Sequence, residues 1–392
     1  MTKEFPNFQT STLSIKFSNV ASPLAGVQTI THLKHGGDID RFAQEARKDK
    51  EGICDFSSNI NPLGISSAVE KTYRESLFCI LEYPDSYARA LCGQVADHFC
   101  LAPDQVIVGN GAISLIDLTI RAFRPKRALL VEPCFNEYRR LLNLYGAQVR
   151  QIFLKEGDAF NFSYRDILRE LDGIDMIILG YPNNPTGTAL QREEMISLIK
   201  EAARRKIFLL IDEAFVDWNP HLSIYQEIKE SPFVVVIRSL TKFFALAGIR
   251  AGFALAQPHV IVRMRAVQEP WSCNGLAQRL SIAALQDIEF QRKSLIWFRE
   301  ESKHFYPLLI QFPELKVFPS LANFFLMKLD DKEDEKVFWN FMKSQGIYLR
   351  DMNDIVGLNN RYFRVALKDR RQNSILIDKL KEVFAKEQCL SS

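Results

Sequence analysis

The sequence predicts an α/β protein whose centre is a large, mostly parallel sheet. From about residue 104 onward, apolar runs of four to six residues alternate with segments of helical periodicity. Such short, uniformly apolar runs are typical of strands that are buried on both faces of a sheet. Polar residues follow several of these runs, at the strand ends where α/β sheets bind ligands. The chain has 392 residues, 47% of them hydrophobic, which is enough for one or two domains with a large core.

The elements of the large sheet follow one another in a regular order. Helices are expected at 114–123 and 192–205, where apolar residues recur with the helical period. The apolar runs predict strands at 105–109, 127–133, 148–154, 175–180, 207–213, 233–240 and 250–256.

After about residue 280 the pattern changes to that of a smaller α+β domain. Residues 278–309 have the periodicity of one or two long helices. Further on, strands are expected at 315–320, 323–329, 347–352 and 362–367, around a helix at 334–345. We therefore expect three parts: an N-terminal segment (1–75) that packs with the small domain, a large α/β domain (76–285) and a small C-terminal α+β domain (286–392).

Charge and composition argue against several classes of protein. The net charge of +3 gives no support for a nucleic-acid or membrane-surface partner. No apolar run reaches the roughly 18 residues of a membrane helix, and the first residues lack the continuous apolar region of a secretory signal. The seven cysteines are scattered and form no C-x-x-C pair, which favours free thiols in a reducing cytoplasm over a zinc site or a disulfide framework.

A glycine turn follows the first strand of the large domain. Gly109-Asn110-Gly111 leads into a helix that starts near Ala112. A helix that begins in this way offers unpaired backbone N–H groups, which suit a phosphate. The same turn is also a common connection between a strand and a helix, so the signal is weak when taken alone.

Three further strand ends carry polar residues. "YPNNPTG" follows one strand and directs Asn183 and Asn184, although a plain turn is the alternative. Another strand ends in Asp212-Glu213, which is either a solvated strand end or a carboxylate aimed at a cationic ligand atom. The third is followed by Ser239, Thr241 and Lys242, with Arg250 eight residues further on, in "SLTKFFALAGIRAGF".

Together these strand ends suggest one cofactor. A buried amine beside another cation has a lowered pKa and becomes a nucleophile toward carbonyls. Two hydroxyls and an arginine suit a phosphate dianion. With an acid for a ring nitrogen, these are the parts that pyridoxal phosphate requires.

In order and spacing, "NNPTG", "DEAF" and "SLTKFFALAGIRAGF" resemble the motifs of the fold-type I pyridoxal-phosphate enzymes, in the aminotransferase class I/II branch. The resemblance covers nearly the whole chain and implies the fold of that group, with a large and a small domain. It implies that Lys242 binds the cofactor aldehyde and shuttles protons. Asp212 is the implied partner of the pyridinium nitrogen, and Asn184 the implied donor to the 3′ oxygen.

The resemblance also implies the other contacts of the cofactor and of the substrate. Phe135 is in the place of the aromatic residue that stacks on the ring, and Arg364 in that of the arginine that binds the substrate α-carboxylate. Tyr83 resembles a tyrosine that reaches the phosphate from the neighbouring subunit, which implies a homodimer. The implied phosphate cup consists of Gly111, Ala112, Ile113, Ser239, Thr241 and Arg250.

Two positions depart from the pattern of the family. Phe215 stands where many aminotransferases have a tyrosine that touches the 3′ oxygen, so this contact is lost. Ala112 and Ile113 lack the hydroxyl or acid often found in the cup, which leaves the backbone N–H groups to bind the phosphate.

The N-terminal segment favours one branch of this family. "HGGDID" and "NINPLG" resemble the threonine-phosphate decarboxylases of the cobalamin pathway, whereas the cofactor motifs also occur in histidinol-phosphate aminotransferases. The resemblance implies O-phospho-L-threonine as substrate, without excluding O-phospho-L-serine. A pyridoxal-binding regulator is a third hypothesis, but no DNA-binding segment is visible.

The implied substrate residues are His35, Gly36, Asn61, Asn184, Arg350 and Arg364. His35 is read as a lid over the substrate phosphate, or simply as part of a turn ahead of a helix that Asp38 caps. Arg350 is a further candidate for the phosphate, or else an exposed arginine at a strand end.

Overall fold

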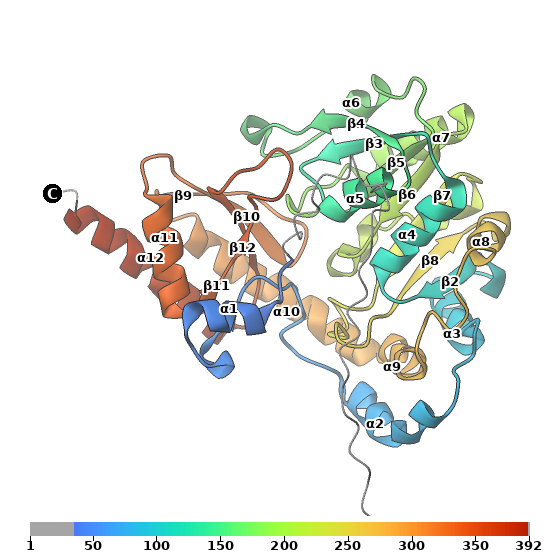
Figure 1. Ribbon diagram of the computed structural model, residues 1–392, viewed down its shortest axis with the longest axis horizontal. Coiled ribbons are helices and arrows are strands. Elements are labelled where there is room, and N and C mark those ends of the chain that lie inside the picture. Colours follow the sequence, from blue (N-terminus) through green and yellow to red (C-terminus); the bar gives the residue numbers. More distant parts are fainter. Residues whose placement is uncertain (1–34, 391–392) are drawn as a thin grey trace, which may run out of the picture. The chain divides into compact units, whose positions relative to one another are not determined.

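The computed structural model describes residues 35–390, and a seven-stranded sheet forms the centre of its larger part (Figure 1). The strands follow the order β2-β8-β7-β6-β5-β3-β4, and only β8 runs antiparallel to its neighbours. Their bounds are Val106–Gly109 (β2), Arg127–Glu132 (β3), Gln148–Phe153 (β4), Met176–Gly180 (β5), Phe208–Asp212 (β6), Val234–Ser239 (β7) and Gly252–Ala256 (β8). All seven expected strands are therefore present.

Helices cover both faces of this sheet, because successive strand residues point to opposite sides. Leu130 and Leu210 pack toward α4 (Ala112–Phe123), α5 (Asn136–Leu144) and α8 (Pro258–Arg265). Leu129 and Leu209 pack on the other side, toward α3 (Arg89–Phe99) and α7 (Arg192–Arg205). The short helix α6 (Tyr164–Leu168) contacts α7. The expected helix at 192–205 is confirmed in its full length.

A second, antiparallel sheet has the strand order β12-β13-β10-β9. Its strands are Leu315–Val317 (β9), Phe324–Leu329 (β10), Arg350–Asp351 (β12) and Tyr362–Ala366 (β13). Its apolar side chains share one core with those of α10 (Ile288–Leu309), α11 (Glu335–Gln345) and α12 (Arg370–Leu390). The expected α+β arrangement is present after residue 280.

The described part of the N-terminal segment contacts several separate parts of the fold. Helix α1 (Ile39–Ala46) begins at Asp38, whose side chain accepts the N–H of Arg41 as an N-cap. Strand β1 (Cys54–Asp55) pairs in parallel with β11 (Ile347–Tyr348). Helix α2 (Ser67–Glu75), in contrast, packs against α9 (Gly275–Gln286). The division of the chain at residues 75 and 285 stays a prediction.

The 3₁₀ helices occupy connections between the regular elements. They are Lys50–Gly52 (η1), Leu77–Leu81 (η2), Pro103–Gln105 (η3), Glu156–Asp158 (η4), Val216–Trp218 (η5), Pro220–Leu222 (η6) and Tyr225–Lys229 (η7). Among the helices of residues 35–390, none combines the length and the apolar character needed to cross a membrane.

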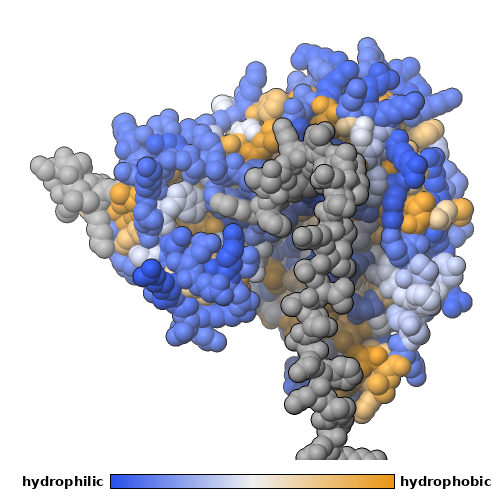
Figure 2. Space-filling view, viewed as in Figure 1, coloured by the Kyte–Doolittle hydropathy of each residue, from blue (hydrophilic) through white to orange (hydrophobic). Residues whose placement is uncertain are grey.

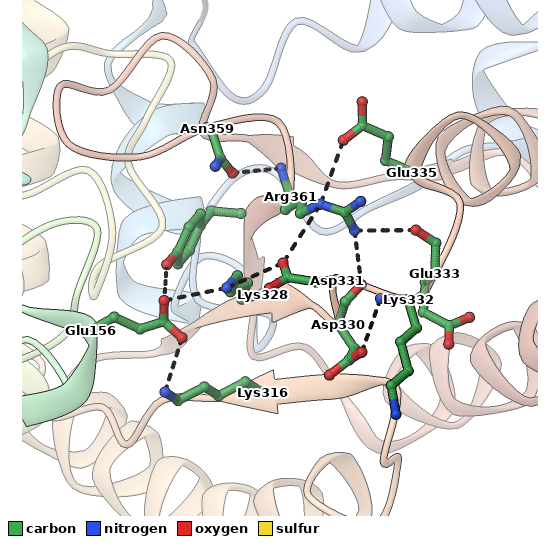
Figure 3. A network of polar contacts seen from close by, with 11 residues as sticks. Glu156, Lys316, Lys328, Asp330, Asp331, Lys332, Glu333, Glu335, Asn359 and Arg361 are labelled. Atoms are coloured by element: carbon green, nitrogen blue, oxygen red, sulfur yellow. Dashed lines mark hydrogen bonds and ion pairs between the residues drawn. The ribbon is translucent and has the colours of Figure 1, made fainter.

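Glu156 joins the two large sheets (Figure 3). It lies in η4, after β4, and accepts hydrogen bonds from Tyr362 Oη at 2.7 Å and from Lys316 Nζ at 2.9 Å. Burial opposes its ionisation, but these hydrogen bonds and the charge of Lys328 outweigh burial and lower the pKa of Glu156 to about 2. Tyr362 precedes Arg364 by two residues on β13, so this contact fixes the strand that carries Arg364.

Candidate active site

A cavity of about 710 Å³ lies where the ends of β6 and β7 meet the antiparallel sheet. The carboxyl ends of parallel strands are the usual ligand site of an α/β sheet. Most residues predicted from the sequence line this cavity: His35, Gly36, Ala112, Ile113, Phe135, Asn184, Asp212, Ser239, Thr241, Lys242, Arg250, Arg350 and Arg364. Residues up to 329 positions apart in the sequence are thus brought together around one space.

One side of the cavity is an anion cradle at the start of α4. Gly111 has φ = +83°, and a Cβ atom at this position would lie 2.8 Å from Nη2 of Arg250. The glycine therefore lets Arg250 approach the first turn of α4, where backbone N–H groups are unpaired. Ser239 Oγ and Thr241 Oγ1 are buried and lie 2.7 Å apart. This combination of donors fits a phosphate.

Lys242 is half-buried in the bend after β7, and it lines the cavity. Burial lowers the pKa of its amine to about 8; the charge of Asp212 opposes this shift, and Arg250 and Arg364 add to it. Its Nζ atom lies 5.6 Å from the centre of the Phe215 ring. The amine is therefore partly neutral near neutral pH, as a nucleophile toward an aldehyde must be.

Asp212 ends β6 with its carboxylate buried. Burial raises the pKa of the carboxyl group, while hydrogen bonding by Tyr138, the charge of Lys242 and the N–H of Ala214 counteract this. The hydroxyl of Tyr138 donates to Oδ2 of Asp212 at 2.7 Å, and the N–H of Ala214 donates to Oδ1 at 3.0 Å. A buried carboxylate held in this way suits a protonated ring nitrogen.

Tyr138 is a site residue that was not predicted from the sequence. Its ring packs edge-to-face on that of Phe135, with 5.5 Å between the ring centres. Phe135 immediately precedes α5, and Tyr138 lies in its first turn. Residues three apart at the start of a helix face the same way. Tyr138 could therefore have been predicted from its position three residues after Phe135, the expected ring-stacking residue.

Two arginines face the cavity from adjacent strands. Arg350 on β12 and Arg364 on β13 are direct partners in the antiparallel register. Arg364 donates to Asn184 Oδ1 and, at 3.0 Å, to the carbonyl oxygen of Ser57, while its Nε atom is buried without a hydrogen-bond partner among residues 35–390. Burial, with a smaller effect of Arg350, lowers the pKa of Arg364 to about 9. A bound anion would accept a hydrogen bond from the unpaired Nε atom of Arg364 and would reduce the repulsion between the charges of Arg350 and Arg364.

Arg350 is buried, which differs from the alternative of an exposed arginine at a strand end. It forms an ion pair with Asp354, with Nη1 at 2.9 Å from Oδ1 and Nη2 at 3.0 Å from Oδ2. Asn136 Nδ2 also donates to Asp354, at 3.1 Å. This pairing fixes the guanidinium at the wall of the cavity.

The turn that contains His35 packs against Ser57. A Cβ atom on Gly36 would lie 2.2 Å from the carbonyl oxygen of Ser57, and the N–H of Gly37 donates to Ser57 Oγ at 2.8 Å. The turn brings His35 Nε2 to 3.2 Å from Oε1 of Glu137 on α5. The turn thus lies at the cavity in addition to leading into the helix that Asp38 caps.

Besides Gly111, which lies next to Arg250, two predicted residues do not line this cavity. The sequence placed Asn61 at the substrate, but its side chain is buried and bonded to Phe243 and Ser294, and Asn59 and Ile60 line the cavity instead. This corrects the expected position of Asn61. Tyr83 is 84% exposed and does not line the cavity of its own chain.

Comparison with known proteins identifies the family of the chain. Residues 51–380 match the family described as "Aminotransferase class I and II". The chain belongs to this family. A threonine-phosphate decarboxylase of Salmonella typhimurium is 34% identical over 89% of this chain and 96% of its own length.

Solved structures of class I and II aminotransferase relatives show the same fold. The histidinol-phosphate aminotransferase of Clostridium acetobutylicum gives a TM-score of 0.79, with 32% identity over 84% of this chain and 98% of the other. The histidinol-phosphate aminotransferase of Sinorhizobium meliloti, solved in complex with pyridoxal-5'-phosphate, gives a TM-score of 0.81. It is 18% identical, and the match covers 93% of this chain and 99% of the other. The predicted fold-type I architecture is thereby confirmed.

The Sinorhizobium meliloti structure contains pyridoxal-5'-phosphate, which is also the cofactor that the sequence predicts for this chain. The residues present fit it. The donors around Arg250 match its phosphate, the buried carboxylate of Asp212 matches its basic ring nitrogen, and the amine of Lys242 matches its aldehyde.

Proposed function

We propose that the protein decarboxylates O-phospho-L-threonine in a pyridoxal-phosphate-dependent reaction and supplies the amino-alcohol phosphate for cobamide biosynthesis. The observation that carries the proposal is the pair of buried arginines, Arg350 and Arg364, in direct register at the cavity. Two adjacent cations suit a substrate with two anionic groups, here a carboxylate and a phosphate. The decarboxylase named among the relatives supports the same reaction.

The cofactor is proposed to be held by residues on three sides. Phe135 stacks on its ring, Asn184 and Asp212 bind the 3′ oxygen and the ring nitrogen, and Lys242 binds the aldehyde. The first turn of α4, with Gly111, Ala112 and Ile113, binds the phosphate together with Ser239, Thr241 and Arg250. Pyridoxal phosphate held by these residues would supply an electron sink for the bond that breaks at the substrate Cα.

The residues of the chain select which bond this is. Arg364 binds the substrate carboxylate, and its contacts with Asn184 and Ser57 fix the direction of the guanidinium. Arg350 binds the substrate phosphate from the neighbouring strand, and His35 with Gly36 closes over it. With both ends held, the bond from Cα to the carboxyl carbon would break and CO2 would leave. Lys242, released from the aldehyde when the substrate amine takes its place, would then deliver a proton to Cα. Asp212 keeps the ring nitrogen protonated throughout.

Transamination is the alternative activity, because an aminotransferase uses the same cofactor residues. There Lys242 would remove the Cα proton, and the amine would pass to a keto acid. A solved relative named histidinol-phosphate aminotransferase supports this alternative. Histidinol phosphate has a phosphate but no carboxylate, so in that reaction the second arginine would serve only the keto acid, whereas O-phospho-L-threonine engages both arginines at once.

The experiment incubates the enzyme with O-phospho-L-threonine and measures CO2 release alongside amine transfer to 2-oxoglutarate. We expect CO2, with loss of the reaction in Lys242→Ala and in Arg364→Ala. Amine transfer without CO2 would rule out the decarboxylase. O-phospho-L-serine serves as comparator, and the missing methyl group is expected to change kcat/KM by only about 10- to 200-fold.

We also propose a homodimer with shared active sites. Apolar side chains are exposed over α2, η2 and the segment after it, where Figure 2 shows a patch of apolar surface. The patch includes Phe78, Leu81 and Tyr83, each more than 75% exposed, and the ring centre of Tyr83 lies 5.0 Å from that of Trp271. Such a surface is typical of an interface, and a second copy would place Tyr83 at its neighbour's phosphate cup.

Mixing two inactive variants tests the dimer. If Tyr83 acts in the neighbouring subunit, Tyr83→Ala mixed with Lys242→Ala regains part of the activity, because hybrid dimers hold one site with both native residues. A monomer in sedimentation velocity, or no recovery of activity on mixing when hybrids form, would contradict the proposal.

We further propose that the protein is located in the cytoplasm. The free thiols of the described cysteines support this location, and cell fractionation tests it.

A further inference from the structure

Asn61 is bonded to the backbone of the bend that carries Lys242. Its N–H donates to the carbonyl oxygen of Lys242 at 3.0 Å, and its side-chain Nδ2 donates to the carbonyl oxygen of Phe243 at 2.8 Å. The second N–H of the same amide faces Ser294 Oγ on α10 at 2.8 Å, and the side-chain oxygen accepts from the N–H of Leu63 at 3.1 Å. Asn61 is 2% exposed, so all of these contacts are made away from water.

The bend needs such support because it is not part of a helix or a strand. Strand β7 ends at Ser239, and residues 240–250 form bends and turns. Within this segment the carbonyl oxygen of Lys242 accepts from the N–H of Ala245 at 3.2 Å. Ala245 itself has a positive φ of 55°, a conformation that is unfavourable for a residue with a side chain. Contacts from outside must therefore hold this backbone in place.

We infer that Asn61 is a positioning residue for Lys242. It fixes two successive carbonyl groups of the bend and ties them to α10, so that the amine is held at the place that the cofactor aldehyde occupies. The inference rests on the proposed role of Lys242. Asn61 of the "NINPLG" motif would thus act on the lysine, whereas the sequence predicted that it binds the substrate.

Two forms of the cofactor separate positioning of the lysine from general support of the fold. Pyridoxal phosphate binds the cradle and bonds to Lys242, whereas pyridoxamine phosphate has an amine in place of the aldehyde and cannot form that bond. A change that displaces only the lysine weakens the first form more than the second. A change that loosens the whole site weakens both alike.

Asn323 offers a matched control. It is fully buried, and its Nδ2 donates to the carbonyl oxygen of Asn59 at 3.0 Å, so it holds the same segment at another residue. Its side chain bonds Asn59 rather than the lysine bend. Asn323→Ala therefore removes a buried amide that bonds Asn59, two residues before Asn61, and leaves the contacts of Asn61 with the lysine bend in place.

The experiment measures dissociation constants of both cofactor forms for the full-length enzyme after removal of bound cofactor by dialysis. In Asn61→Ala we expect pyridoxal phosphate to bind about tenfold more weakly, with little change for pyridoxamine phosphate. The fraction of cofactor that borohydride fixes to the protein should fall as well. Ser294→Ala keeps the bond to Phe243 and should show a smaller shift of the same kind.

The outcomes distinguish the inference from the proposed function. Equal weakening of both forms in Asn61→Ala, or the same selective loss in Asn323→Ala, overturns the inference. If Asn61→Ala does not fold, Ser294→Ala decides in the same way. In Lys242→Ala the preference for pyridoxal phosphate should vanish altogether; a preference that persists there overturns the proposed role of Lys242 itself.

Discussion

The hydroxyl of Tyr138 lies 2.7 Å from Oδ2 of Asp212, and both groups are buried. This hydrogen bond is one of the contacts that oppose the effect of burial on the pKa of the carboxyl group. Without it, the carboxylate would be less ionised and less well oriented toward a ring nitrogen.

We therefore predict that Tyr138→Phe weakens cofactor binding by about tenfold or more, the usual effect of losing a hydrogen bond to a charged group. Spectroscopic titration of the cofactor-free enzyme with pyridoxal phosphate measures this. Tyr145→Phe is the matched control, because Tyr145 donates to Asp117 at 2.9 Å away from the cavity. Equal effects of the two substitutions would contradict a role through Asp212.

The lowered pKa of Lys242 predicts a dependence of stability on pH. In the folded, cofactor-free protein the pKa is about 8, against an ordinary value of 10.5. Between these values the unfolded chain binds more protons at this residue, so its contribution makes the free energy of unfolding rise with pH. Below pH 8 the unfavourable contribution is present in full.

Urea denaturation of the cofactor-free enzyme across this range, compared with Lys242→Met, checks the prediction. The difference in free energy of unfolding between the two proteins should shift in favour of the native enzyme as the pH rises. A constant difference would mean that the amine titrates at its ordinary pKa.

Gly36→Ala should act on the substrate and leave the cofactor in place. The added Cβ would lie 2.2 Å from the carbonyl oxygen of Ser57, so the turn must move and take His35 with it. We expect KM for O-phospho-L-threonine to rise about tenfold or more, since small displacements of binding groups have large effects. Cofactor affinity should stay unchanged. Gly52→Ala in the same segment meets no atom within 4 Å and should behave as the native enzyme.

A buried ion pair lies behind the cofactor site. Arg238, next to Ser239, donates to Glu213, next to Asp212, at 2.8 Å, and it also donates to Asp217. Both members of the Arg238–Glu213 pair are buried. Removing one partner leaves a buried charge uncompensated, so we predict that Arg238→Met lowers the free energy of unfolding by about 3–5 kcal/mol.

Urea denaturation measures this loss, and a surface pair provides the comparison. Arg292 and Glu289 form an exposed pair on α10, with 2.9 Å between Nη2 and Oε1, so Arg292→Met should leave the free energy of unfolding nearly unchanged. Similar losses for the two variants would show that burial adds nothing to the Arg238–Glu213 pair.

The strands and the longer helices could be predicted because local periodicity determines them. The run "FLLID" is apolar because β6 is buried on both faces, and α7 shows its buried side at helical spacing. The pairing of Cys54 with Ile347 could not be predicted, because it joins segments far apart in the chain and leaves no local pattern. The packing of α2 against α9 could not be predicted for the same reason.

For the site, motifs located the residues at strand ends, and the fold brings them together around one cavity. Tyr138 and Ser57 were missed because their importance depends on partners that tertiary structure supplies. Asn61 shows another limit. In a loop without regular periodicity, the sequence identified the right segment but not which of its side chains faces the cavity.

The anchoring of the lysine bend has a consequence for how the protein folds. Asn61 lies 182 residues from Phe243 and 233 from Ser294, so the three meet only after distant parts of the chain have been brought together. Contacts of such long sequence separation form slowly, because the loops between them must close first. We expect the reactive amine to reach its working position late in folding, when the surrounding sheets already enclose it.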